Sequence, residues 1–133
     1  YFKVSDADNQ IIYESGALDD QLMLDKKAHT YHSIPVDRHG QPVWKHDLFR
    51  MTGDVYKNII ESGDTDIIEF EFFVPDWAES PLSVSSSLKY RKFNRKYTEW
   101  IYGKKAPQLP ITEMSKDSFL IPVIDQPSAR SGE

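Results

Sequence analysis

Hydrophobic and polar residues alternate along several short stretches of this chain, with turn-forming residues between them. Residues 1–4 (YFKV) and 11–14 (IIYE) are rich in aromatic and β-branched side chains, and they flank the turn sequence Asp-Ala-Asp-Asn. This pattern predicts a β-hairpin that ends at Ser15-Gly16. Residues 17–33 are polar and irregular, and they are predicted to form a long connection.

The next strands are predicted from shorter signals. Residues 33–36 (SIPV) precede an Asp-Arg-His-Gly turn at 37–40, and residues 43–49 are predicted to form a second strand. A short helical turn is expected within residues 48–56. The clearest alternation lies in residues 65–74 (TDIIEFEFFV), where isoleucine and phenylalanine alternate with glutamate. It predicts a strand with one buried and one solvent-facing side.

A basic and aromatic segment follows. Residues 82–93 (LSVSSSLKYRKF) alternate as a strand, which would place Lys89 and Arg91 toward solvent and Tyr90 toward the core. Residues 95–102 carry Tyr, Trp and Ile at helical spacing and end at a glycine, so we expect a short helix that buries Trp100.

The chain closes with residues 118–124 (SFLIPVI), whose proline is typical of an edge strand, and with a polar tail at 125–133 that is expected to be disordered. Five or more strands with frequent turns and little helix predict an all-β fold. We expect an antiparallel β-sandwich, immunoglobulin-like or Greek-key, with one short helix and long loops. At 133 residues the chain is predicted to be one domain, residues 1–124, followed by the tail.

The net charge and its distribution along the sequence indicate which kind of macromolecule the chain could bind. The net charge is −5, which disfavours nucleic-acid binding, although seven of the sixteen Lys and Arg residues lie between positions 88 and 105. A local basic patch on an acidic body suits docking onto an acidic protein surface. The predicted partner-binding residues are Lys89, Arg91, Lys92, Arg95, Lys96 and Trp100.

Candidate chemistry is sparse. The chain has no cysteine, which excludes disulfides, thiol catalysis and covalent attachment of haem c within it. It has no apolar run long enough for a transmembrane helix. All four histidines, His29, His32, His39 and His46, lie in one segment and are candidates for contact with a metal ion or a haem, with ordinary loop histidines as the alternative.

Three further candidate sites follow from residue type. Asp37 and Asp47 accompany the histidines, but no serine occupies a nucleophile elbow, so we do not predict an enzyme; a metal-dependent enzyme using the histidines is the less favoured alternative. Trp44 and Trp77 would suit a carbohydrate- or surface-binding platform. The acidic pairs at 6/8, 19/20 and 64/66 lack a complete calcium-loop pattern and are interpreted as turn caps.

Several motifs resemble a known family. They are D-x-x-G-x-P-x-x-x-H-D at residues 37–47, K-Y-R-K-x-N at 89–94 and L-P-I-x-x-M-x-x-D-S at 109–118. Together with the surrounding residues 1–124, they resemble the C-terminal β-rich domain of bacterial multihaem c-type cytochromes of the cytochrome c554-like family. The resemblance implies a periplasmic or extracellular domain that scaffolds or docks a multihaem cytochrome in an electron-transfer assembly.

The chain departs from that family in two places. It has no C-x-x-C-H haem site, so the resemblance implies that haem c belongs to a partner module or to a missing N-terminal part. It also lacks the H-x-F/I-P-T-G strand that precedes such domains. The resemblance therefore implies a fragment of a longer haem protein or a strand donated by a partner, because an open sheet edge readily pairs with an added strand.

Overall fold

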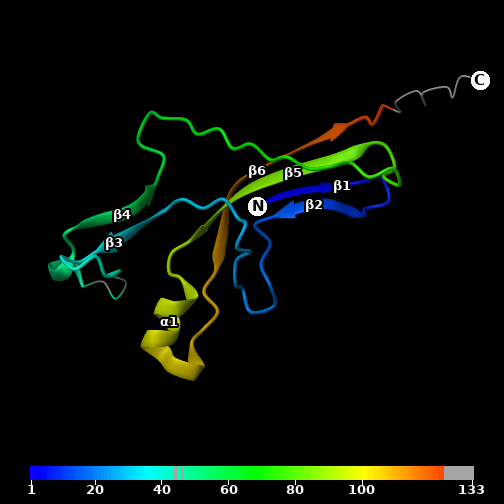
Figure 1. Cartoon of the computed structure of the whole chain (residues 1–133). Coiled ribbons are helices and arrows are strands. Elements are labelled where there is room, and N and C mark those ends of the chain that lie inside the picture. Colours follow the sequence, from blue (N-terminus) through cyan, green and yellow to red (C-terminus); the bar gives the residue numbers. More distant parts are fainter. Residues whose placement is uncertain (44, 46, 125–133) are drawn as a thin grey trace, which may run out of the picture.

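The computed structural model describes residues 1–43, 45 and 47–124, and over these it is mostly β (Figure 1). The elements in chain order are β1 (Phe2–Ser5), β2 (Ile11–Ser15), β3 (His32–Val36), a 3₁₀ turn (Leu48–Arg50), β4 (Gly53–Asn58), β5 (Leu82–Arg91), α1 (Arg95–Tyr102), a second 3₁₀ turn (Gly103–Lys105) and β6 (Ile111–Ile121). All strand pairs are antiparallel. The predicted antiparallel β fold with one short helix is thus confirmed.

The larger sheet has four strands in the order β2-β1-β5-β6. The predicted hairpin of β1 and β2 is present, with Val4 opposite Tyr13. On its other side β1 pairs with the first half of β5, where Val4 lies opposite Val84. β5 and β6 pair along their whole length, so both strands run on beyond β1 as a two-stranded ribbon.

One face of this sheet carries the hydrophobic core. Val4, Leu82 and Val84 are buried there. Residues 65–74 cross the same face: the ring of Phe70 stacks on Phe2 with centroids 4.3 Å apart, and the ring of Phe72 stacks on Tyr13 at 5.6 Å.

The strand prediction for residues 65–74 is wrong in one respect. The segment is extended and turns Phe70 and Phe72 inward, as the alternation indicated, but it belongs to neither sheet. Its apolar side chains meet the sheet while its backbone forms no ladder with any described strand. The alternation correctly predicted which side chains of the segment face the sheet. It did not predict whether the backbone of the segment is hydrogen-bonded to a neighbouring strand.

The second sheet is a two-stranded ribbon of β3 and β4 that extends away from the first (Figure 1). Its connection turns at Asp37, and Gly40 has a φ of +73°, a conformation that glycine adopts without strain. The predicted strand at 43–49 is wrong, because the described part of that stretch contains no strand and its last residues begin the 3₁₀ turn Leu48–Arg50. The single bridge nearby, from Val36 to Pro42, precedes it. That turn confirms the helical turn expected within 48–56.

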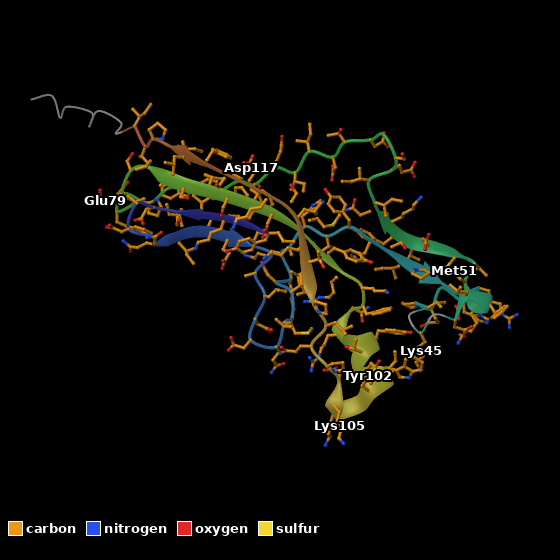
Figure 2. All side chains as sticks on the ribbon, turned by 180° about the vertical axis from the view of Figure 1, so that it is seen from behind. Lys45, Met51, Glu79, Tyr102, Lys105 and Asp117 are labelled. Atoms are coloured by element: carbon orange, nitrogen blue, oxygen red, sulfur yellow. The ribbon has the colours of Figure 1, made fainter. Side chains whose placement is uncertain are left out.

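The helix α1 begins and ends where its sequence indicates. The Asn94 side chain accepts a hydrogen bond from the Tyr97 backbone N–H at 2.8 Å, and Gly103 ends the helix with a φ of +58°. Lys105 lies at the tip of the projection that α1 and the second 3₁₀ turn form (Figure 2). The predicted burial of two aromatic residues is wrong, because Tyr90 is 53% and Trp100 is 50% exposed. Both lie beyond the part of the sheet that residues 65–74 cover.

The last strand, β6, confirms the predicted edge strand but starts earlier, directly after Pro110. Its longer extent follows from β5, which offers a partner at every position from Leu82 to Arg91. The tail at 125–133, for which disorder was predicted, lies outside the described residues. None of the helices in the described part of the chain has the length and apolar character needed to cross a membrane.

Candidate functional site

The six predicted partner-binding residues are divided between two elements. Lys89 and Arg91 are on β5, and the other four lie in the bend after β5 and in α1. The ammonium group of Lys89 lies 4.5 Å from the centroid of the Tyr1 ring, a cation–π arrangement.

Arg91 has a structural contact of its own. Its Nη2 donates a 2.6 Å hydrogen bond to the carbonyl oxygen of Leu22, in the connection between β2 and β3. This bond ties that connection to the far end of β5. Arg91 is therefore less available to a partner than the sequence pattern indicated.

The residues near α1 form a basic and aromatic arm. Arg95 Nε lies 2.7 Å from Glu99 Oε1, and the Lys45 ammonium lies 5.3 Å from the centroid of the Trp100 ring. Lys92 is exposed and lies 5.5 Å from the Phe93 ring. Together with Lys96, these residues place charged and aromatic side chains around α1. We call residues 89–105 the basic arm.

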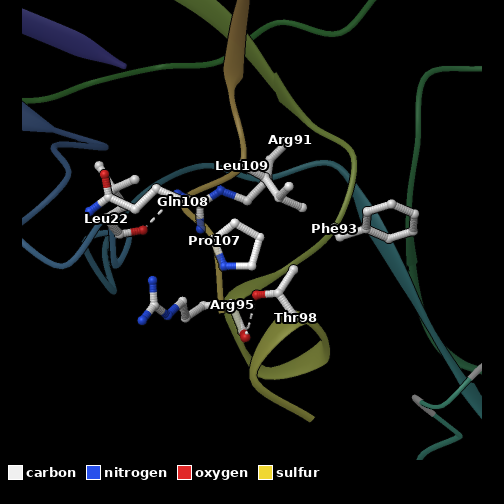
Figure 3. A pocket seen from close by; sticks show the side chains of 8 residues that line it. All are labelled: Leu22, Arg91, Phe93, Arg95, Thr98, Pro107, Gln108 and Leu109. Carbon is white, nitrogen blue, oxygen red and sulfur yellow. Dashed lines mark hydrogen bonds between the residues drawn. The ribbon is translucent and has the colours of Figure 1, made fainter. Parts of the chain in front are cut away.

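A shallow cleft lies where the basic arm joins β6 (Figure 3). Thr98 is buried beside it and donates its hydroxyl to the Arg95 carbonyl oxygen at 2.9 Å. The cleft is lined by Leu22, Arg91, Phe93, Arg95, Thr98, Pro107, Gln108 and Leu109. Its free space suits about one water molecule, so we interpret it as a joint between elements rather than as a ligand site.

The structure does not gather the three described histidines into one metal-binding cluster. His32 Nδ1 lies 3.1 Å from the Thr30 hydroxyl, and its ring packs 5.0 Å from the Tyr56 ring. His39 Nε2 accepts a hydrogen bond from Arg38 at 3.0 Å, on the turn after β3. His46 lies outside the described residues. Within residues 1–43, 45 and 47–124 no three metal-ligating side chains converge.

His29 belongs to a polar cluster that sequence reasoning missed. Its Nε2 lies 3.5 Å from Asp66 Oδ2, and the Tyr31 hydroxyl donates a 2.8 Å hydrogen bond to the same oxygen. Burial, then the bond to the Asp66 carboxylate, raises the pKa of Tyr31. The cluster joins the start of the β3 ribbon to the start of residues 65–74. Contacts between positions 35 residues apart leave no local signal in the sequence.

Asp37 is a turn residue, as predicted. Its Oδ1 accepts hydrogen bonds from the backbone N–H groups of His39 and Gln41, and its Oδ2 lies 2.6 Å from Arg50 Nη2. The backbone bonds from Gln41 and His39, followed by Arg50, lower the pKa of Asp37 to about 2. The group stays ionised near neutral pH, and both of its oxygens hold the turn and its arginine in place.

Only one of the two tryptophans of the predicted carbohydrate-binding platform lies within the described residues. Trp77 is 51% exposed in the loop before β5. Trp44 lies outside the described residues. A platform that uses both rings therefore stays a prediction.

A further feature of the molecule is exposed apolar surface on the larger sheet. On β6, Phe119 lies opposite Val84 and Ile121 opposite Leu82, so all four side chains share one face of the sheet. Val84 and Leu82 are buried, yet Phe119 is 56% and Ile121 is 40% exposed. Sequence reasoning did not single out these β6 residues, although alternation along 118–124 places them on one side. Residues 65–74 therefore cover β1 and β5 and leave the β6 side of the apolar face open.

Comparisons with known protein families, with curated proteins and with solved structures find no match to this chain.

Proposed function

We propose that this chain is a non-catalytic β-sandwich domain or subunit that scaffolds or docks a multihaem c-type cytochrome in an extracytoplasmic electron-transfer assembly. The observation that carries the proposal is the exposed apolar surface of the described residues. Ile67, Phe73, Phe119 and Leu120 are each more than half exposed. Large apolar side chains gathered on a surface in this way favour a chain that is completed by a partner.

The sandwich part of the proposal rests on the covered sheet face. A sandwich needs a second layer over the apolar face of the first. Residues 65–74 supply one extended segment of such a layer, with Phe70 and Phe72 directed at the sheet. We take this segment as the beginning of the second layer, with its remaining strands contributed from outside the described residues.

The non-catalytic part rests on the arrangement of the polar groups. His29, His32 and His39 each contact different neighbours. Asp37 is held by two backbone amides and an arginine. Asp37 and His39 both line a cavity of about 300 Å³ beside the β3–β4 connection, together with Arg38, Phe49, Arg50 and Thr52. Both oxygens of Asp37 are engaged in holding the turn, which supports a structural role for this group.

The identity of the partner rests on the sequence resemblance, and the basic arm agrees with it in charge. Haem propionates and acidic protein surfaces are bound by Lys and Arg. The exposed Lys92 and the lysines at the end of α1, Lys104 and Lys105, present such groups on an otherwise acidic chain. The haem would belong to the partner, because this chain has no cysteine.

The test is association with an acidic multihaem c-type cytochrome immobilised on a biosensor surface. The double variant Lys92→Glu, Lys105→Glu changes two exposed side chains outside the sheet core. It is expected to bind on the order of tenfold more weakly at low salt, with the difference vanishing at high salt.

The matched control is the double variant Lys26→Glu, Lys57→Glu, which makes the same charge change at exposed positions away from the basic arm. It should bind as the parent does. Equal losses in the two double variants would show a net-charge effect and count against a docking face at the basic arm. Binding that ignores salt would do the same.

A further inference from the structure

We propose that residues 65–74 form a strand-addition site, which pairs with an extended partner segment of alternating basic and apolar residues. The proposal deepens the proposed function, because it names the kind of contact by which a partner completes the second layer. It rests on three features of the described residues: the free backbone of this segment, the open apolar surface on β6, and the charges that the segment presents to solvent.

The first feature is the backbone of residues 65–74. Among the residues that the structure describes, none of the N–H or C=O groups in this segment makes a hydrogen bond. The nearest backbone bonds are those of the turns on either side, from Asp64 N–H to Glu61 and from Ala78 N–H to Pro75. An extended segment with free donors and acceptors is a template for an added strand.

Packing fixes this template in place. The stacked ring pairs with Phe2 and Tyr13 hold its inward side, and the Tyr31–Asp66 bond of 2.8 Å holds its start. A partner would therefore meet a segment that is already extended. Less conformational entropy is lost when such a preordered segment pairs than when a flexible loop does.

The second feature is the apolar surface beside the segment. Phe119 and Ile121 share the face that residues 65–74 cross, but they remain half exposed. Neighbouring strands lie about 4.8 Å apart, so strands added beside residues 65–74 would extend the layer over the sheet. The inward apolar residues of such strands would bury these two side chains.

The third feature, the charges on the outward side of the segment, indicates which kind of strand would pair with it. The outward row of the segment consists of Ile67, Glu69, Glu71 and Phe73, all exposed. In an antiparallel pair with a second copy of the chain centred on Phe70, Glu69 would lie opposite Glu71, and like charges directly opposite destabilise a ladder. A partner strand with Lys or Arg opposite Glu69 and Glu71 would instead be stabilised by the pairing of opposite charges. The geometry thus points to a basic, alternating strand rather than to self-association.

The experiment uses a capped nine-residue peptide that alternates lysine and valine. Its binding is followed by hydrogen exchange with mass spectrometry on the full chain. At up to about 1 mM peptide, the amides of residues 65–74 should exchange at least about tenfold more slowly. The amides of β3 and β4 should not change, because both strands are already paired.

Two controls separate strand addition from charge attraction. The same peptide N-methylated at three consecutive central residues keeps its charges but loses hydrogen bonding at both edges, and it should give no protection. The variant Glu69→Lys, Glu71→Lys should lose protection by the lysine peptide and gain it from a glutamate–valine peptide. Both substituted side chains are exposed, so the fold should be retained.

Three results would overturn the proposal. They are no protection by the lysine peptide, equal protection by the N-methylated peptide, and protection in the chain alone together with a dimer in sedimentation, which would identify a second copy as the occupant. Each differs from failure of the cytochrome experiment. Salt-dependent binding through the basic arm can persist without strand addition, and strand addition can persist without a cytochrome.

Discussion

The four-stranded sheet and the β3–β4 ribbon are held together by different interactions. The sheet buries Val4, Leu82 and Val84 under two stacked aromatic pairs. The ribbon buries one apolar side chain, Val36, and depends on the hydrogen bonds of Asp37. Both are antiparallel, and the pairing is irregular at two positions in the sheet and at one in the ribbon.

The difference indicates which region gives the chain its stability. A fully buried aliphatic side chain contributes about 1.5–3 kcal/mol, whereas a typical hydrogen bond contributes about 0.5–1.5 kcal/mol. The sheet should therefore carry the cooperative unfolding transition. The ribbon should open locally at a lower free energy, as regions with few buried apolar contacts do.

The largest effect is expected when the core of the sheet is truncated. Leu82→Ala leaves a cavity at a buried position and should lower the free energy of unfolding by about 2–4 kcal/mol. Urea denaturation followed by circular dichroism measures this. Leu48→Ala, at an exposed position in the ribbon connection, should change the value by less than about 0.5 kcal/mol. Similar losses in the two variants would erase the distinction between the regions.

A smaller loss is expected when the covering segment is released. Phe70→Ala removes the ring that stacks on Phe2, and because Phe70 is only partly buried the free energy of unfolding should fall by about 1–3 kcal/mol. Phe73→Ala on the outward side of the same segment is the control, and it should be near neutral. If Phe73→Ala were the more damaging change, the inward direction of Phe70 would be wrong.

These two regions also show what the sequence could predict. The alternation in residues 65–74 correctly separated the inward phenylalanines from the outward glutamates, because period 2 is a local property of extended chain. It could not show whether a neighbouring strand is present, because backbone pairing depends on residues far away in the sequence. Tyr90 shows the same limit of the sequence pattern. The alternation correctly placed it on the side of β5 that carries Leu82 and Val84, but residues 65–74 do not extend over β5 as far as Tyr90.

The basic arm likewise has some features that the sequence predicts and others that it does not. The helix and its end at Gly103 followed from helical spacing and from the conformational freedom of glycine. The contact between Arg91 and Leu22 did not, since it joins positions 69 residues apart. Charge density therefore identified the arm, whereas only the fold shows which of its cations hold the molecule together.

An intermediate effect, confined to the ribbon, is expected on acidification. The pKa of Asp37 is lowered from 3.8 to about 2, so the folded state favours the ionised carboxylate. Its contribution is fully present above about pH 4 and is lost as the pH falls toward 2. Hydrogen exchange, corrected for intrinsic rates, should become several-fold faster in β3 and β4 between pH 4 and 2. The Asp37→Asn variant should lack this pH dependence, and a ribbon that opens equally with pH in that variant would exclude Asp37 as the cause.

The smallest effect is expected for an exposed ion pair of the ribbon. Lys57 Nζ lies 3.3 Å from Glu61 Oε1, and both side chains are mostly exposed. Lys57→Ala should change the free energy of unfolding by less than about 0.5 kcal/mol, measured by urea denaturation at low and high salt. A salt-sensitive loss above about 1 kcal/mol would show that the ribbon depends on surface charge more than its Asp37 turn indicates.

The position of β6 at the margin of the larger sheet has a consequence for handling the protein. Eleven consecutive residues there present one side of the backbone with no described neighbour, a geometry that promotes aggregation between molecules. Glu113, Lys116 and Asp117 interrupt the strand with charge, as gatekeeper residues do in soluble β proteins. Neutralising all three should lower the solubility of the purified chain well before it changes the fold.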